Sequence, residues 1–168
     1  MSVLYAVLAL VVLQRLGELA LAAANTRRLR RMGAIEIDRA GYPLFVALHA
    51  GWLASLALFV PAEAPPSWAL LGLFGLLQCG RIWVIASLGP HWTTRLIVQP
   101  LASPVRSGPY RLCRHPNYLI VAGEIAVLPL AFGAVAIALV FSIANALLLA
   151  RRIRIEDAAL AGRAHAPA

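Results

Sequence analysis

The residues of this chain that could do chemistry lie at the two ends of a late apolar stretch. Gly108-Pro109-Tyr110-Arg111 and Arg114-His115-Pro116-Asn117-Tyr118 precede the stretch, and Arg152-Ile153-Arg154-Ile155-Glu156-Asp157 follows it. Histidine, tyrosine, arginine and carboxylate side chains can together bind a molecule that carries charges and hydroxyls. Ionisable groups beside lipid are costly and usually mark function. The pattern therefore predicts a site for a polar cofactor next to a membrane.

The composition predicts that membrane helices position this chemistry. The 168 residues are 61% hydrophobic and 13% charged, which leaves too little polar surface for a soluble domain of this size. Apolar stretches run from Ser2 to Ala24, Pro43 to Val60, Trp68 to Leu88, Tyr118 to Phe132 and Ala134 to Ala150. A helix needs about 20 residues to cross the hydrocarbon, so the first three stretches are long enough and the last two are short.

We therefore expect an all-α integral membrane protein with about five transmembrane segments. The last two segments should form a short helical hairpin that bends at Pro129 and turns at Gly133. Residues 1–160 should be one polytopic domain, with the cofactor part at about residues 88–160 and a frayed tail at residues 161–168.

The charges predict the orientation of the chain. The net charge of +8 comes from fifteen basic residues, all arginines, which lie largely between the apolar stretches. This distribution is typical of a topology signal, so we expect no nucleic-acid partner. The loop from Pro61 to Ser67 has no arginine. The positive-inside rule then places the arginine-rich loops and the C-terminus in the cytoplasm and the N-terminus outside. Cys79 and Cys113 lack metal-site spacing, and we expect no metal.

The same motifs resemble a known family. Leu88-Gly89, Trp92-Thr93 and the polar segments at residues 105–111, 114–118 and 152–157 resemble the isoprenylcysteine carboxyl methyltransferase family. Its members are integral membrane enzymes that use S-adenosylmethionine. Residues 33–36, Tyr42-Pro43 and His49 resemble a bacterial branch described as alkylpyrone O-methyltransferases. The resemblance covers nearly the whole chain.

The chain departs from the better-known members of this family at two places. Leu119 follows Tyr118 where those members soon have a glycine, and here the glycine comes only at Gly123. The acidic pair near the C-terminus is Glu156-Asp157 instead of two glutamates. The first departure concerns local helix packing, and the second leaves the role of Asp157 less defined than that of Glu156.

S-adenosylmethionine presents a carboxylate, an ammonium, ribose hydroxyls, an adenine and a sulfonium, so its pocket needs donors, acceptors and an apolar slot. Arg152 or Arg154 could hold the carboxylate, and Glu156 could accept from the ribose or the ammonium. His115 and Tyr118 could donate from a helix start, or could simply cap that helix. The expected cofactor-binding residues are Gly108, Pro109, Tyr110, His115, Tyr118, Arg152 and Glu156, with His115, Arg152 and Glu156 as the catalytic ones.

The acceptor should be chosen by the loop from His91 to Arg106, which could lie in the headgroup plane as a lip. The expected substrate-binding residues are Trp92, Thr94, Glu36, His49 and Glu124. Three of these residues have structural alternatives: Trp92 as an interfacial anchor, His49 as a buried histidine, and Glu124 as half of an ion pair with Arg81 or Arg15. Arg15 and Glu18 share a helix face and could pair within the first span, either in a functional role or only to lock two helices together.

The function that we expect is S-adenosylmethionine-dependent O-methyl transfer to a lipophilic molecule that enters from the bilayer. The branch resemblance favours an alkylpyrone or alkylresorcinol. The alternatives are carboxyl methylation of isoprenylcysteine or another lipidic acid, an NADPH-dependent membrane reductase, and a non-catalytic membrane scaffold. An ionised acceptor needs no general base, whereas a less acidic phenol would need His115 or Glu36 to take its proton.

Overall fold

The fold is a bundle of long helices, which a computed structural model describes over residues 2–98 and 107–164. The α-helices in this part of the chain are α1 (Val3–Arg31), α2 (Tyr42–Phe59), α3 (Trp68–Leu88), α4 (Pro116–Ala131) and α5 (Val135–Ala164). Short connecting elements are the 3-10 helices η1 (Gly89–His91) and η2 (Gly108–Arg111) and the strands β1 (Ile35–Glu36) and β2 (Ile97–Val98).

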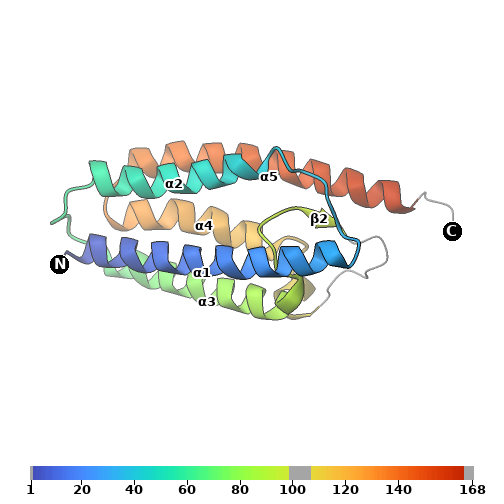
Figure 1. Ribbon diagram of the computed structural model, residues 1–168. Helices are drawn as coiled ribbons and strands as arrows, with labels where there is room; N and C mark the ends of the chain where they lie inside the picture. The colour runs from blue at the N-terminus through green and yellow to red at the C-terminus, as the bar shows by residue number, and fades with distance from the viewer. Residues whose placement is uncertain (1, 99–106, 165–168) are drawn as a thin grey trace.

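The helices lie side by side along one direction, with the chain termini at opposite ends of the bundle (Figure 1). Helix α4 lies in the middle and packs most extensively on α3 and α5. Its Ile125 and Leu128 are almost fully buried, and they join a core that includes Leu4 and Leu8 of α1 and Trp52 of α2.

The outer faces of the bundle are apolar, as expected for helices surrounded by lipid. Large hydrophobic side chains that are more than half exposed include Leu10, Leu13, Leu58, Phe59, Leu76, Ile82, Leu139, Val140, Ile143 and Leu147. Among the described residues, four helices are long and apolar enough to cross a membrane, and α4 is a shorter apolar helix between two of them. The prediction of an all-α membrane protein with about five segments is confirmed.

The predicted hairpin of the last two segments exists, but its second arm is not short. The turn is made at Gly133, whose φ of +71° suits glycine, and the Ala134 amide donates to the Pro129 carbonyl. Helix α5 then continues for 30 residues, through Ala164. Arg152 to Glu156 is therefore helix and not a turn, because no proline or glycine interrupts α5 before Gly162. The helix also covers residues 161–164 of the predicted frayed tail, and residues 165–168 lie outside the described part.

A small β-ribbon joins two loops at the end of the bundle that carries the C-terminus. Strands β1 and β2 pair antiparallel, with Ile35 opposite Val98 and Glu36 opposite Ile97. The apolar segment before Gln99 was predicted to lie in the headgroup plane. Its residues Ile97 and Val98 form β2, because their backbone pairs with β1, and the position in the headgroup plane stays a prediction. The remainder of the predicted lip, residues 99–106, lies outside the described residues.

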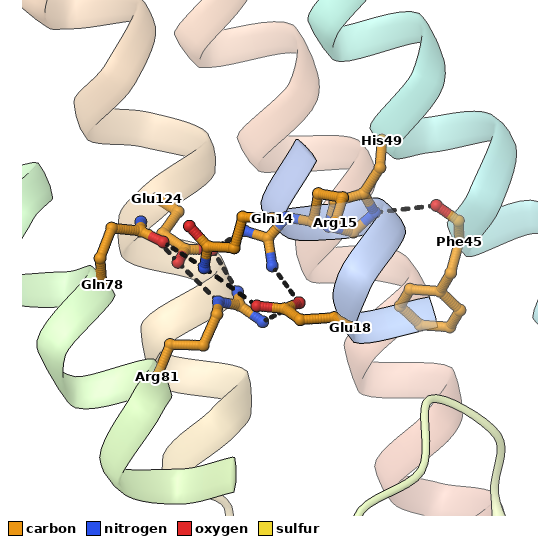
Figure 2. A network of polar contacts seen from close by, with 8 residues as sticks. All are labelled: Gln14, Arg15, Glu18, Phe45, His49, Gln78, Arg81 and Glu124. Carbon is orange, nitrogen blue, oxygen red and sulfur yellow. Dashed lines mark hydrogen bonds and ion pairs between the residues drawn. The ribbon is translucent and has the colours of Figure 1, made fainter. Parts of the chain in front are cut away.

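A buried ion-pair network connects α1, α3 and α4 near the middle of the bundle (Figure 2). Its members are Gln14, Arg15, Glu18, Gln78, Arg81 and Glu124. Glu124 accepts from Arg15 at 2.6 Å and from Arg81 Nε at 2.7 Å, and Arg15 also donates to Glu18 at 2.7 Å. Two arginines face two glutamates, so the charges of the network cancel. The predicted Arg15–Glu18 pair and both predicted partners of Glu124 are present.

Candidate functional site

Three side chains from the predicted site meet where α4 begins. The Tyr118 hydroxyl donates to Glu156 Oε2 at 2.9 Å, although the two residues are 38 positions apart. His115 Nδ1 is 3.9 Å from the same carboxylate oxygen. The rings of His115 and Tyr118 stack, with their centroids 5.1 Å apart. His115 is the residue just before α4, so Pro116 starts the helix while the imidazole stays beside Tyr118. The α4–α5 hairpin thus brings both sequence motifs to one place.

Arg152 adds a positive charge to this cluster. It lies one helical turn before Glu156, on the same face of α5. Its guanidinium carbon is 5.8 Å from the centre of the Tyr118 ring and 5.2 Å from that of Phe45, and Nη2 donates to the Thr94 carbonyl at 3.1 Å. Its Nε is buried and has no hydrogen-bond partner among the described residues. The sequence left open whether Arg152 or Arg154 could hold a carboxylate. In the structure Arg152 lies at the site, whereas Arg154 is exposed.

Two residues at this site were missed by the sequence analysis. Phe45 lies on α2, and its ring stacks on the Arg152 guanidinium with the ring centre 5.2 Å from the guanidinium carbon. The sequence signal that could have pointed to Phe45 is its spacing of three residues from Tyr42. In the structure both aromatic rings stack on arginines. Asn117 was quoted within the motif, but no role was predicted for it. Its Oδ1 is buried without a partner among the described residues.

The neighbouring acidic and basic residues have other partners. Asp157 pairs with Arg114 at 3.3 Å, and both side chains are largely exposed. Arg151 donates to both carboxylate oxygens of Asp38 at 2.9 Å. The first pair is a surface salt bridge, and the second holds the loop before α2 against α5. Asp157 and Glu156 therefore differ in position although they are adjacent in sequence.

The segment Gly108 to Tyr110 forms η2 and packs against the end of α3. Gly108 has a φ of +57°, and a Cβ atom there would lie 2.1 Å from Ser87 Oγ and 3.2 Å from Trp83 Nε1. Burial raises the pKa of Tyr110 to about 12, and the negative charge of Glu156 adds to this effect. The Tyr110 hydroxyl therefore remains protonated and can donate a hydrogen bond.

Replacing Gly108 with alanine should lower the free energy of unfolding in detergent by about 1–3 kcal/mol. The alanine would be strained at a positive φ, and its Cβ would also clash with Ser87. Gly33→Ala is the matched control, since Gly33 has a φ of +82° with open space around it. Adding Ser87→Ala to Gly108→Ala should recover part of the loss. Equal melting temperatures for the Gly108 and Gly33 variants would contradict this account of the close contact.

Trp92 is not an exposed loop anchor. It is 3% exposed and lies in a small core with Ala22 and Val84, against which Tyr110 packs. Asn25 of α1 explains this placement, because its amide donates to the carbonyls of Gly89 and Trp92 and ties the loop to the bundle. This burial does not fit the interfacial-anchor interpretation of Trp92, and its indole Nε1 has no hydrogen-bond partner among the described residues, so a substrate role for Trp92 stays a prediction.

The remaining predicted substrate residues are separated. Thr94 reaches the site through its carbonyl, which accepts from Arg152. Glu36 lies in the β-ribbon and is bound by Arg30 and Arg95. Burial alone would raise the pKa of Glu36, but the hydrogen bonds and charges of Arg95 and Arg30 outweigh it and lower the pKa. Glu36 is therefore a poor general base.

His49 and Glu124 lie deeper in the bundle than the His115 cluster. His49 Nδ1 is 2.8 Å from the Phe45 carbonyl, and its ring meets the Trp52 ring edge-on. Glu124 is 1% exposed and belongs to the ion-pair network. His49 lies on the side of this network that faces α2 (Figure 2). The structure thus gives Glu124 the structural partners that the sequence analysis offered as the alternative to a substrate role.

Comparisons with known proteins cover the part of the chain that contains these residues. The sequence pattern of the isoprenylcysteine carboxyl methyltransferase (ICMT) family matches residues 70–162, which include His115, Tyr118, Arg152 and Glu156. A protein of Bacillus subtilis (strain 168), called Uncharacterized protein YpbQ, is 37% identical over 158 residues, which are 91% of this chain and 94% of that protein. No solved structure matches the chain.

Proposed function

Because this chain belongs to the isoprenylcysteine carboxyl methyltransferase family, a family of membrane methyltransferases, we propose that it transfers a methyl group from S-adenosylmethionine to an oxygen of a lipophilic acceptor. The observation that carries the proposal is the cluster of His115, Tyr118 and Glu156 beside Arg152. It combines a cation, an anion and neutral donors at one end of a membrane bundle.

The residues at the site fit this cofactor. Buried polar atoms of Arg152 and Asn117 lack partners among the described residues, and a ligand with acceptors and donors would satisfy them. Arg152 would hold the carboxylate, since its guanidinium can donate two parallel hydrogen bonds. Glu156 would accept from the ammonium or the ribose hydroxyls and Tyr110 would donate, while Tyr118, whose one O–H bond donates to Glu156, would hold that carboxylate in place.

The chain's contribution to the reaction is positioning and the exclusion of water. The cofactor supplies an activated methyl group, and transfer is an in-line displacement that needs the acceptor oxygen aligned with it. The stacked rings of His115 and Tyr118 and the Phe45 ring over Arg152 form apolar walls that keep water out of such a site.

The proposed acceptor is an alkylpyrone or alkylresorcinol that enters from the bilayer between helices. The resemblance of residues 33–36, Tyr42-Pro43 and His49 to the alkylpyrone branch supports this choice. An acidic pyrone enol would already be ionised. For a phenol, His115 is the better candidate base, because Glu156 lies 3.9 Å away and can orient its ring, whereas Glu36 is held by two arginines. Carboxyl methylation of isoprenylcysteine or another lipidic acid is the second candidate and needs no base.

The proposed topology places the cofactor site on the cytoplasmic side of a bacterial inner membrane. The arginine-rich end of the bundle also carries η2, the β-ribbon and the last turns of α5 (Figure 1). The positive-inside rule then puts the N-terminus outside and lets the cofactor enter from the cytoplasm.

Calorimetric titration of the detergent-purified protein tests the proposal. We expect saturable binding of S-adenosylmethionine and of its demethylated product, and loss of both in His115→Ala. NADPH, titrated alongside, should not bind. Binding of NADPH in place of the methyl donor would indicate a reductase, and a folded protein that binds neither would indicate a scaffold.

A further inference from the structure

One face of α5 carries polar residues well beyond the cofactor cluster. Ser142, Asn145, Leu149, Arg152 and Glu156 are spaced by three and four residues, so their side chains share one side of the helix. This side faces α2 and α4, because Arg152 lies beside Phe45 of α2 and Tyr118 of α4. Asn145 lies two turns from Arg152 toward the other end of the bundle, a distance of about 10 Å along the axis.

Asn145 is buried at that depth without a partner for its carbonyl oxygen. The residue is 1% exposed, and Oδ1 has no hydrogen-bond partner among the described residues. An unpaired polar group costs several kcal/mol in a membrane interior, where no water can replace the partner. Ser142 Oγ is also buried and unpartnered, but a serine in a helix can turn to its own backbone. Asn145 is therefore the stronger indication of a missing ligand.

A purely structural role does not account for this arrangement. An asparagine that joins membrane helices does so by hydrogen bonding across the interface. The structure gives Oδ1 of Asn145 no hydrogen bond of this kind within residues 2–98 and 107–159. Leu149 lies between Asn145 and Arg152 on the same face, so an apolar surface separates the charged cluster from the amide. A molecule bound along this face would meet charges, then an apolar patch, then an amide.

We propose that Asn145 binds a second ring oxygen of the acceptor, while the oxygen that receives the methyl group points toward the Arg152–Glu156 cluster. The inference rests on the proposed function and names its acceptor class, a lipid whose ring head carries two oxygen groups. An amide suits this role because it can accept from a hydroxyl and donate to a carbonyl. Resorcinol and pyrone rings both carry a second oxygen, and the alkyl chain can extend toward lipid.

Methylation kinetics with a pair of acceptors test the inference. The pair is a 5-alkylresorcinol and the 3-alkylphenol of equal chain length, which differ by one hydroxyl. Wild type should show a kcat/KM about tenfold or more higher for the resorcinol, the effect expected from one hydrogen bond to a buried group. Asn145→Leu, a variant of similar size, should lose this preference. It should bind S-adenosylmethionine as wild type does, and its melting temperature should not fall, because no native hydrogen bond is removed.

The other outcomes separate the two proposals. If wild type binds S-adenosylmethionine but methylates both phenols equally, or neither of them, the inference about Asn145 is wrong while the cofactor assignment stands. A preference for the resorcinol that persists in Asn145→Leu would also overturn it, and so would a lower melting temperature of that variant, which would indicate a structural bond. If wild type does not bind the methyl donor at all, the proposed function itself fails.

Discussion

Replacing Glu156 with glutamine should weaken S-adenosylmethionine binding by about 10- to 100-fold, the loss of one charge-assisted hydrogen bond of roughly 1.5–3 kcal/mol. The substitution keeps the size of the side chain and an oxygen that can accept from the Tyr118 hydroxyl. What disappears is the negative charge next to Arg152 and His115. Calorimetric titration of the variant in detergent gives the change in affinity directly.

The chain offers a matched control in the adjacent residue. Asp157→Asn removes the same charge one position away, where the carboxylate is half exposed and pairs only with the exposed Arg114 among the described residues. A surface pair of this kind contributes at most about 1 kcal/mol, so affinity should change less than about threefold. If both variants lose the same affinity, the effect is one of net charge and the assigned role of Glu156 is wrong.

Replacing Glu124 with leucine should destabilise the protein by about 3–5 kcal/mol, the usual cost of leaving a buried charge unpaired. Glu124 is the common acceptor for Arg15 and Arg81, and Arg81 is 3% exposed. The variant would leave two arginines facing Glu18 alone. Thermal unfolding in detergent, followed by circular dichroism, should show a large fall in melting temperature and a low yield of folded protein.

A double variant separates charge from packing in this network. Glu124→Leu combined with Arg81→Met removes one charge of each sign and leaves the Arg15–Glu18 pair, at 2.7 Å, in place. We expect the double variant to recover most of the stability, because well-packed apolar residues often replace a buried ion pair at little cost. A double variant as unstable as the single one would show that packing around Glu124, and not the unpaired charge, dominates.

Local patterns were sufficient to predict the helices and a cluster of His115, Tyr118 and Glu156. Each apolar stretch forms a helix because its backbone polar groups have no alternative partner in lipid. The Gly133 turn forces α4 and α5 to lie antiparallel, which brings Tyr118 and Glu156 together. The Arg15–Glu18 pair followed from helical spacing, and the partners of Glu124 followed from the scarcity of cations at that depth.

The connecting segments could not be predicted in the same way. Their conformations depend on contacts between parts of the chain that are distant in sequence. Trp92 is buried because Asn25 binds the carbonyls around it, and Leu96 to Val98 is ordered by pairing with residues in the loop after α1. The role of Phe45 depends on α2 lying beside the end of α5, which no hydrophobic pattern specifies. The continuation of α5 was missed because a change from apolar to charged residues marks the membrane surface and not the end of a helix.

The unequal arms of the α4–α5 hairpin have a consequence for the surrounding bilayer. Helix α4 has 16 residues and is about 24 Å long, roughly 6 Å less than the hydrocarbon thickness. A bilayer with the Gly133 turn at one surface would hold His115, at the other end of α4, below the opposite headgroups, while α4 itself packs between the longer helices α3 and α5. Helix α5, at 30 residues, passes beyond that surface. The recessed end of α4 therefore places surrounding lipid headgroups beside the route by which the proposed cofactor would reach the site.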